Sequence, residues 1–223
     1  MKIRSVVLCL LAFAAASQAQ SVEAVLARMD QAAPGFRGMT ADVEMKTFTA
    51  ILSDTTSESG TLKMQRLKTG EVRAIIDFSA QTDARVIAFL GSIVRIYYPK
   101  LSAYQDYEVG KNSDVLNQFL LLGFGSSGRQ LAQSYQITME GPEKVAGRDT
   151  TKLLLVPKDQ KVKDHLAKIE MWVPADAAYP IQQQFYEPSG NYRIVTYENI
   201  KINPPRHGVL ELKLPRGVKK QGS

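Results

Sequence analysis

The strongest constraint on the fold is a long series of short segments in which apolar and polar side chains alternate. In TADVEMK, for example, Ala41, Val43 and Met45 alternate with charged residues, a period of two that is typical of a strand with one buried face. The segments follow one another at hairpin spacing, which favours antiparallel pairing over a βαβ arrangement. We therefore predict a mainly β (α+β) fold whose curved antiparallel sheet forms an unclosed β-barrel. The predicted strands cover residues 40–52, 60–67, 71–79, 84–91, 92–99, 103–110, 135–141, 148–157, 167–174, 180–188, 191–203 and 209–215.

Helical periodicity is found at the start of this series and again in its middle. Apolar residues recur at i, i+3, i+4, i+7 and i+11 from Val22, which predicts an amphipathic helix over residues 21–33 that ends at Pro34. A second, polar helix is expected around residues 129–134.

The segment SDVLNQFLLLGFGSSG, residues 113–128, predicts a third helix of unusual composition. Ser113 can cap it, but its apolar side chains leave almost no polar face, so it must be covered on several sides. Two interpretations stay open. The helix is either a fixed part of the core or a lid over an apolar cavity, with Gly123, Gly125 and Gly128 allowing it to swing.

The first nineteen residues have the pattern of a secretory signal peptide. Lys2 and Arg4 precede an apolar run at residues 6–16, and a small-x-small site follows at residues 17–19. We expect a mature chain that begins at Gln20 and forms a single domain over residues 20–223. The one cysteine, Cys9, lies inside the apolar run, so disulfides and thiolate chemistry are excluded from the expected mature chain.

The sequence offers little for catalysis. His165 and His207 show no metal-ligand spacing, and nucleophile or nucleotide-binding motifs are absent from the sequence. Glu140, Glu170 and Glu187 could pair for glycoside hydrolysis, although each lies in an alternating strand where we expect a solvent-facing acid. We therefore expect no enzyme, no metal and no cofactor. The whole chain carries a formal charge of +6, and its basic residues are scattered apart from two groups, Lys158, Lys161 and Lys163 and a tail with Lys213, Arg216, Lys219 and Lys220. Nucleic acid is disfavoured as a partner because export is expected and no basic stripe is interleaved with aromatic residues.

One arginine breaks the alternation. In GTLKMQRL the side chains of Leu62, Met64 and Arg66 share one face of the strand, so Arg66 points with the apolar set. A guanidinium facing inward needs partners, and the C-terminal carbonyls of the apolar helix are natural acceptors. The alternative is that the strand ends at Gln65 and Arg66 turns out to solvent.

The order of several short motifs resembles the LolA/LolB family of periplasmic lipoprotein carriers, whose fold is shared with mycobacterial lipid carriers and a sensor of envelope stress. The resemblance covers essentially all of the expected mature chain. It is closest to LolA, the soluble carrier, because no lipidated cysteine is expected. The motifs are MTADVEMK, GTLKMQR, LGSIVRIYYP, AKIEMWVP, YPIQQQFYEPSG, YRIVTYENIKIN and LELKLPRGV.

The resemblance implies an unclosed barrel with a helical lid over a cavity for acyl chains, and an arginine, here Arg66, that bonds to the lid and keeps it shut. The chain also departs from the family pattern, because Leu67 follows Arg66 where the family has a proline. The implied ligand-binding residues are Leu62, Met64, Arg66, Ala74, Ile76, Phe78, Leu116, Phe119 and Leu120.

The function implied by the resemblance is that of a soluble, monomeric periplasmic chaperone that carries acylated lipoproteins to the outer membrane. Its implied partners are an inner-membrane release complex and an outer-membrane acceptor. A carrier or sensor of another amphiphile, such as a free lipid or glycolipid, is the alternative within the fold. A structural module that binds no ligand is the alternative outside it.

Overall fold

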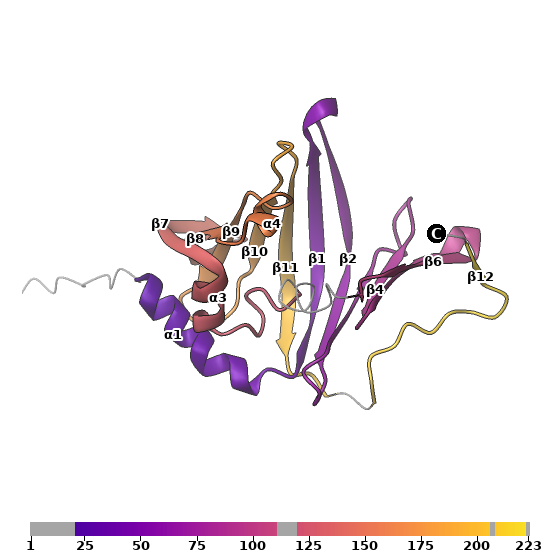
Figure 1. Cartoon of the computed structure of the whole chain (residues 1–223), viewed down its shortest axis with the longest axis horizontal. Coiled ribbons are helices and arrows are strands. Elements are labelled where there is room, and N and C mark those ends of the chain that lie inside the picture. The colour runs from indigo at the N-terminus through magenta and orange to yellow at the C-terminus, as the bar shows by residue number, and fades with distance from the viewer. Residues whose placement is uncertain (1–20, 111–119, 206–207, 222–223) are drawn as a thin grey trace, which may run out of the picture.

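The computed structural model of the chain describes residues 21–110, 120–205 and 208–221, and within them the strands form one twelve-stranded sheet. Its order is β12-β6-β5-β4-β3-β2-β1-β11-β10-β9-β8-β7, and neighbouring strands are antiparallel apart from β12 and β6. The sheet curves strongly about its central strands and does not close (Figure 1). The strands are β1 (Gly38–Thr49), β2 (Asp54–Arg66), β3 (Val72–Asp77), β4 (Val86–Leu90), β5 (Ile93–Tyr98), β6 (Ala103–Glu108), β7 (Tyr135–Val145), β8 (Arg148–Pro157), β9 (Lys168–Pro174), β10 (Gln182–Tyr186), β11 (Tyr192–Ile202) and β12 (Lys219–Lys220).

The long hairpin of β1 and β2 forms the middle of the sheet and rises above its neighbours in Figure 1. The two strands pair without a register shift from Gly38 opposite Gln65 to Thr49 opposite Asp54. A 3-10 turn (Ala50–Leu52) closes the hairpin, and its first amide donates to the Asn191 side chain at 2.9 Å. This frame fixes which side chains of the central strands face the same way.

The two predicted helices at residues 21–33 and 129–134 are present, and each has a capped N-terminus. Helix α1 (Val22–Ala32) begins at Ser21, whose hydroxyl accepts from the Ala24 amide at 3.2 Å. Helix α3 (Gly128–Ser134) begins with a capping box between Ser127 and Gln130. A short helix α4 (Gln160–Lys163) was not predicted. In the described residues, no helix has both the length and the apolar character needed to cross a membrane.

Different elements pack on the two faces of the sheet. We call the face that carries α1 and α3 the inner face. There Val25 and Met29 of α1 and Leu131 of α3 pack on the strands β8 and β9. The opposite, outer face of β3 and β4 is covered by the chain after residue 208, where Leu210 packs on Ala88 and its neighbours.

The predicted strand at residues 209–215 is wrong. This segment runs beside the sheet without joining it: the Leu210 amide donates to the Gln65 side-chain oxygen at 2.6 Å, and the Gln65 side chain donates to the Gly208 carbonyl at 3.1 Å. Leu210 and Leu212 alternate because they face the outer face of the sheet. An alternating sequence shows that one side of a segment is buried, but it does not show which groups form hydrogen bonds with the backbone of that segment.

The predicted apolar helix also needs correction at its C-terminal end. Leu120 is helical, but residues 121–125 form a turn. The amides of Phe124 and Ser126 both donate to the Leu121 carbonyl, at 2.9 and 3.2 Å. The start of this predicted helix lies outside the described residues, as does the predicted signal peptide.

Candidate ligand-binding site

The candidate site is the inner face of β1 to β4 and the neighbouring β11, where the register gathers apolar side chains. Leu62 lies opposite Ile76 and Met64 opposite Ala74 across β2 and β3. Ile76 and Ala74 in turn lie opposite residues of β4. Because directly paired residues project from the same side of a sheet, these predicted site residues share one face. The β4 partners that complete the row are Ile87 and Phe89.

Burial along this row divides it into a floor and an open strip. Leu62 and Met64 are 6% and 3% exposed, and Ala74 is fully buried. The open strip consists of the half-buried side chains packed beside this floor, namely Met45, Ile76, Ile87, Phe89 and Val195. The open strip is an apolar surface that the described residues cover only in part.

Phe78, another predicted site residue, closes one part of this face. It follows β3 and is 2% exposed, and it belongs to the same buried cluster as Leu62 and Met64. Gly60 makes room for it, since a Cβ atom there would lie 2.7 Å from the Phe78 ring. Phe78 therefore faces inward as predicted, but it contributes floor and little free surface.

Arg66 points inward, which confirms the interpretation from parity. It is the last residue of β2, and its guanidinium donates to the main-chain carbonyls of Ala33, at 3.1 Å, and Gly125, at 2.6 Å. The cation also lies 5.5 Å from the centre of the Phe36 ring. Burial lowers the pKa of Arg66 from its ordinary value, yet arginine remains charged at such a site. One side chain thus ties together β2, the end of the α1 region and the turn at residues 121–125.

That turn is part of the core. Leu122 and Phe124 are each 3% exposed, and the Leu122 carbonyl accepts from the Gln183 side chain at 3.2 Å. Gly123 and Gly125 both have positive φ, and an added Cβ would lie 2.8 Å from Pro180 and 2.5 Å from Phe36. These glycines are explained by conformation and close packing, so the structure gives no support to a swinging hinge at residues 121–125.

The remaining predicted site residues come from the same segment. Leu120 is half-buried and packs against the inner-face cluster that contains Leu62. Leu116 and Phe119 lie outside the described residues, so their role stays a prediction. A cavity of about 340 Å³ lies beside the turn, and both carbonyl partners of Arg66 belong to residues that line it.

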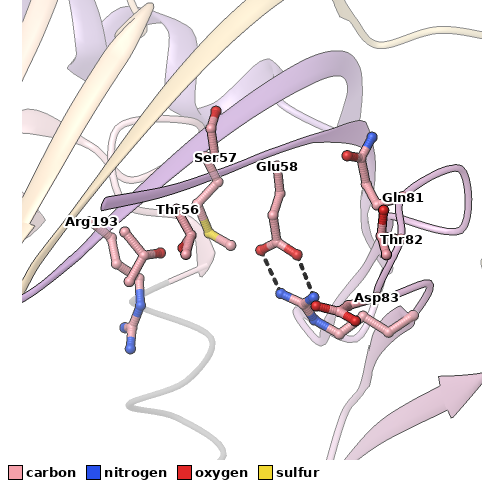
Figure 2. Close-up of a pocket in the computed structure, with 10 residues that line it drawn as sticks. Thr56, Ser57, Glu58, Gln81, Thr82, Asp83 and Arg193 are labelled. Atoms are coloured by element: carbon pink, nitrogen blue, oxygen red, sulfur yellow. Dashed lines mark hydrogen bonds and ion pairs between the residues drawn. The ribbon is translucent and has the colours of Figure 1, made fainter. Parts of the chain in front are cut away.

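A larger groove, of about 670 Å³, adjoins the open strip and is lined mainly by polar residues that sequence reasoning missed (Figure 2). Its central feature is an ion pair in which the Arg85 guanidinium donates two hydrogen bonds to the Glu58 carboxylate. These hydrogen bonds, against the cost of burial, raise the pKa of Arg85. Glu58 lies four residues before Leu62, so extending the alternation of β2 toward its start would have placed it on the inner face. The groove is lined by Met45, Thr47, Thr56, Ser57, Glu58, Gln81, Thr82, Asp83, Arg85 and Arg193.

All three carboxylates considered for hydrolysis are engaged by basic side chains, Glu187 by Arg193 at 3.2 Å and the other two by lysines. Glu170 is not the solvent-facing acid that was expected, because its side chain is 7% exposed and lies 2.8 Å from Lys168 and 3.0 Å from Lys152. Lys152 also pairs with Glu140 at 3.0 Å. Burial alone would raise the pKa of Glu170, but the two lysines outweigh it and lower that pKa overall. Within the described residues, no group of three or more His, Cys, Asp or Glu side chains could hold a metal ion.

Together, the unclosed antiparallel sheet and the helices on its inner face form the LolA-like fold that the sequence predicted. Residues 102–164 match the family model of the MucB/RseB N-terminal domain. This match covers less than half of the chain and supports the resemblance to a LolA-like family, while a closer relation to LolA itself stays a prediction. No curated protein matches the chain significantly.

Three solved structures illustrate how far the similarity extends. MucB is 14% identical with a TM-score of 0.50, over 83% of this chain and 60% of that one. An uncharacterized conserved protein from Thermus thermophilus is 12% identical with a TM-score of 0.50, over 89% and 97%. A LolA superfamily protein from Nitrosomonas europaea is 13% identical with a TM-score of 0.38, over 83% and 95%. At these identities the first two show the shared fold alone, and the chain spans only 60% of the MucB structure.

Proposed function

We propose that this protein is a soluble periplasmic carrier that binds the acyl chains of lipoproteins on its inner face and delivers them to the outer membrane. The observation that carries the proposal is the open strip, whose half-buried apolar side chains lie directly beside a fully buried floor. Burial of a methylene group stabilises by about 0.8 kcal/mol. Part of an acyl chain laid on this strip therefore supplies useful affinity.

Arg66 has a defined place in this proposal. Its hydrogen bond to Gly125 holds the turn at residues 121–125 against the end of β2, and its hydrogen bond to Ala33 ties the end of the α1 region to the same point. We propose that this tie holds residues 121–125 against the buried floor when no ligand is bound, and that its re-formation helps to expel the ligand at its destination. The proposal includes no catalytic role. The proposed delivery partners are an inner-membrane release complex and an outer-membrane acceptor.

A second candidate is a sensor or carrier of another envelope amphiphile, such as a free lipid or glycolipid. The match of residues 102–164 to the MucB/RseB N-terminal domain favours it, because the family resemblance includes a sensor of envelope stress. Both candidates use the same apolar strip and differ in the ligand and in the receiving partner.

Mass spectrometry of the protein purified from a periplasmic extract without detergent separates the candidates. The protein is measured intact under native conditions and again after organic extraction. A bound triacylated peptide or lipoprotein in stoichiometric amount supports the lipoprotein carrier, and a different bound lipid supports the second candidate. If no ligand is found and added lipoprotein does not bind, both are wrong and the inner face is only a core.

A further inference from the structure

The inner face changes from apolar to polar at the same level on neighbouring strands. On β1 the change runs from Val43 through Met45 to Thr47. The register places Glu58 of β2 opposite Met45, and both Thr56 of β2 and Arg193 of β11 opposite Thr47. The open strip therefore ends at a polar boundary that is set by the pairing of the strands.

Strand β4 and its approach show the same change. Phe89 and Ile87 belong to the open strip, and two residues before Ile87 the chain presents Arg85 to the groove. Arg85 packs on the apolar floor as well, since its guanidinium lies 5.1 Å from the centre of the Phe78 ring. The groove of about 670 Å³ is thus continuous with the apolar strip through Met45, which belongs to both.

The charges in the groove balance. Two of its side chains are acidic, Glu58 and Asp83, and two are basic, Arg85 and Arg193 (Figure 2). Glu58 and Arg85 neutralise each other with side chains that are only 19% and 24% exposed. A ligand group with a net negative charge would meet two carboxylates as well as two guanidinium groups, so the groove offers it little electrostatic gain. The other polar lining residues carry hydroxyl or amide groups, namely Thr47, Thr56, Ser57, Gln81 and Thr82.

We infer that this groove binds the polar head of the amphiphile whose acyl part lies on the open strip, and that it selects heads of no net charge that both donate and accept hydrogen bonds. The inference rests on the proposed function and specifies its ligand class. Zwitterionic heads and neutral ester, amide or hydroxyl heads share this chemistry. Heads with a net negative charge are disfavoured because Glu58 and Asp83 face them.

Displacement of an apolar fluorescent dye from the purified protein by single-chain lipids with the same palmitoyl chain tests the inference. The probes are lysophosphatidylcholine, monopalmitoylglycerol and lysophosphatidylglycerol, each below its micelle concentration. We expect the zwitterionic and the neutral lipid to displace the dye at concentrations several-fold lower than the anionic lipid. Equal displacement by all three, or a preference for the anionic lipid, would overturn the inference.

Two variants assign the selectivity to the groove. Glu58→Gln and Asp83→Asn each leave the groove with an excess of positive charge, so the anionic lipid should gain up to about tenfold in affinity. Asp83 is exposed, so its variant keeps the test valid if loss of the Arg85 partner impairs folding. Asp42→Asn is the matched control, because this carboxylate lies on the same hairpin but accepts a hydrogen bond from the Asn199 side chain, and neither residue lines the groove. A similar gain in the control would overturn the assignment.

The result also separates this inference from the proposed function. If the dye and all three lipids fail to bind the folded protein, the carrier proposal is wrong and the headgroup site is wrong with it. If the lipids bind without regard to their head groups and the variants change nothing, the apolar strip still acts as a carrier surface and only the headgroup site is wrong.

Discussion

The two halves of the inner face are built from strands of the same alternating type, but only one half is fully covered. Over β8 and β9 the helices α1 and α3 bury the apolar row completely, and Leu155, Ile169 and Met171 have no exposed surface. Over β3 and β4 the equivalent row includes Ile76 and Ile87, which are half-buried. The first half contributes to stability, while the second has apolar surface to spare for a ligand.

The difference comes from the covering elements more than from the strands. Strands β4 and β8 both have apolar residues at alternating positions. In β4, however, the covered side chains are those of the outer face, which pack against Leu210 and Leu212. The chain after residue 208 therefore stabilises the open half from behind, and the described residues cover its inner side chains only in part. Substitutions in the two halves should accordingly separate folding from binding.

The largest effect is expected in the covered half, from Leu155→Ala. This side chain is fully buried among residues of α1, α3 and the neighbouring strands. Removing it leaves a cavity, and we expect the free energy of unfolding to fall by about 2–5 kcal/mol. Urea unfolding followed by the fluorescence of Trp172, the one tryptophan of the chain, measures this loss. A loss below about 1 kcal/mol would show that the covered half is loosely packed.

Arg66→Leu tests the connection between the two halves. Loss of the guanidinium leaves the Ala33 and Gly125 carbonyls without this donor, so we expect a decrease of about 1.5–3 kcal/mol in the free energy of unfolding. Ligand loading should persist, whereas release of a bound lipid to acceptor vesicles should slow. Arg66→Lys is the matched control, because one ammonium group cannot reproduce the geometry of the fork and should rescue only part of the effect. Unchanged stability, loading and release in Arg66→Leu would refute the proposed tie.

Much of this architecture could be predicted from the sequence, because period-two alternation and turn residues are local signals. Parity predicted an inward Arg66, since it lies two and four residues from Met64 and Leu62, with an exit to solvent after Gln65 as the open alternative. Its partners were expected in the carbonyls after the apolar segment, and Gly125 provides one of them. The carbonyl of Ala33 was not foreseen, because nothing local to either residue indicates a contact between them.

The errors share one physical cause: a local sequence pattern does not show which distant residues a segment contacts. Residues 209–215 alternate like a strand but bind the sheet through the Gln65 side chain. The groove was missed because its charged pair joins Glu58 and Arg85, which are 27 residues apart. Similarly, the sequence left a hinge and a fixed core open for Gly123 and Gly125, and contacts with Pro180 and Phe36 favour the fixed core. Long-range contacts of this kind leave no periodic pattern in one sequence.

A moderate effect on stability is expected from the outer face of the covered half, where Glu170→Gln removes a buried carboxylate between two lysines. The lowered pKa of Glu170 means that the folded state favours its charged form more than the unfolded state does. The resulting stabilisation is complete above the ordinary pKa of 4.5 and is lost as the pH falls through the lower folded-state value. We expect Glu170→Gln to lower the free energy of unfolding by about 1–2 kcal/mol at neutral pH. Unfolding measured over a pH series should show that the variant loses less stability on acidification than the parent protein, and parallel pH curves would contradict this assignment.

The smallest change in stability, and the largest in binding, is expected from Ile87→Ser in the open strip. Because Ile87 is half-buried, its loss should cost about 1 kcal/mol of folding free energy. It should also weaken the binding of an apolar dye or a palmitoyl lipid severalfold, since the ligand would cover this side chain.

Ile75→Ser provides the matched comparison, because Ile75 lies on the same stretch of sheet but faces Leu210 on the outer side. It is 9% exposed, so serine there should reduce stability more than serine at position 87 and leave the dye affinity of the folded protein unchanged. Equal loss of binding in both variants would mean that binding follows general stability. In that case the open half of the inner face would have no special role as a ligand surface, and the contrast between the two halves would concern packing alone.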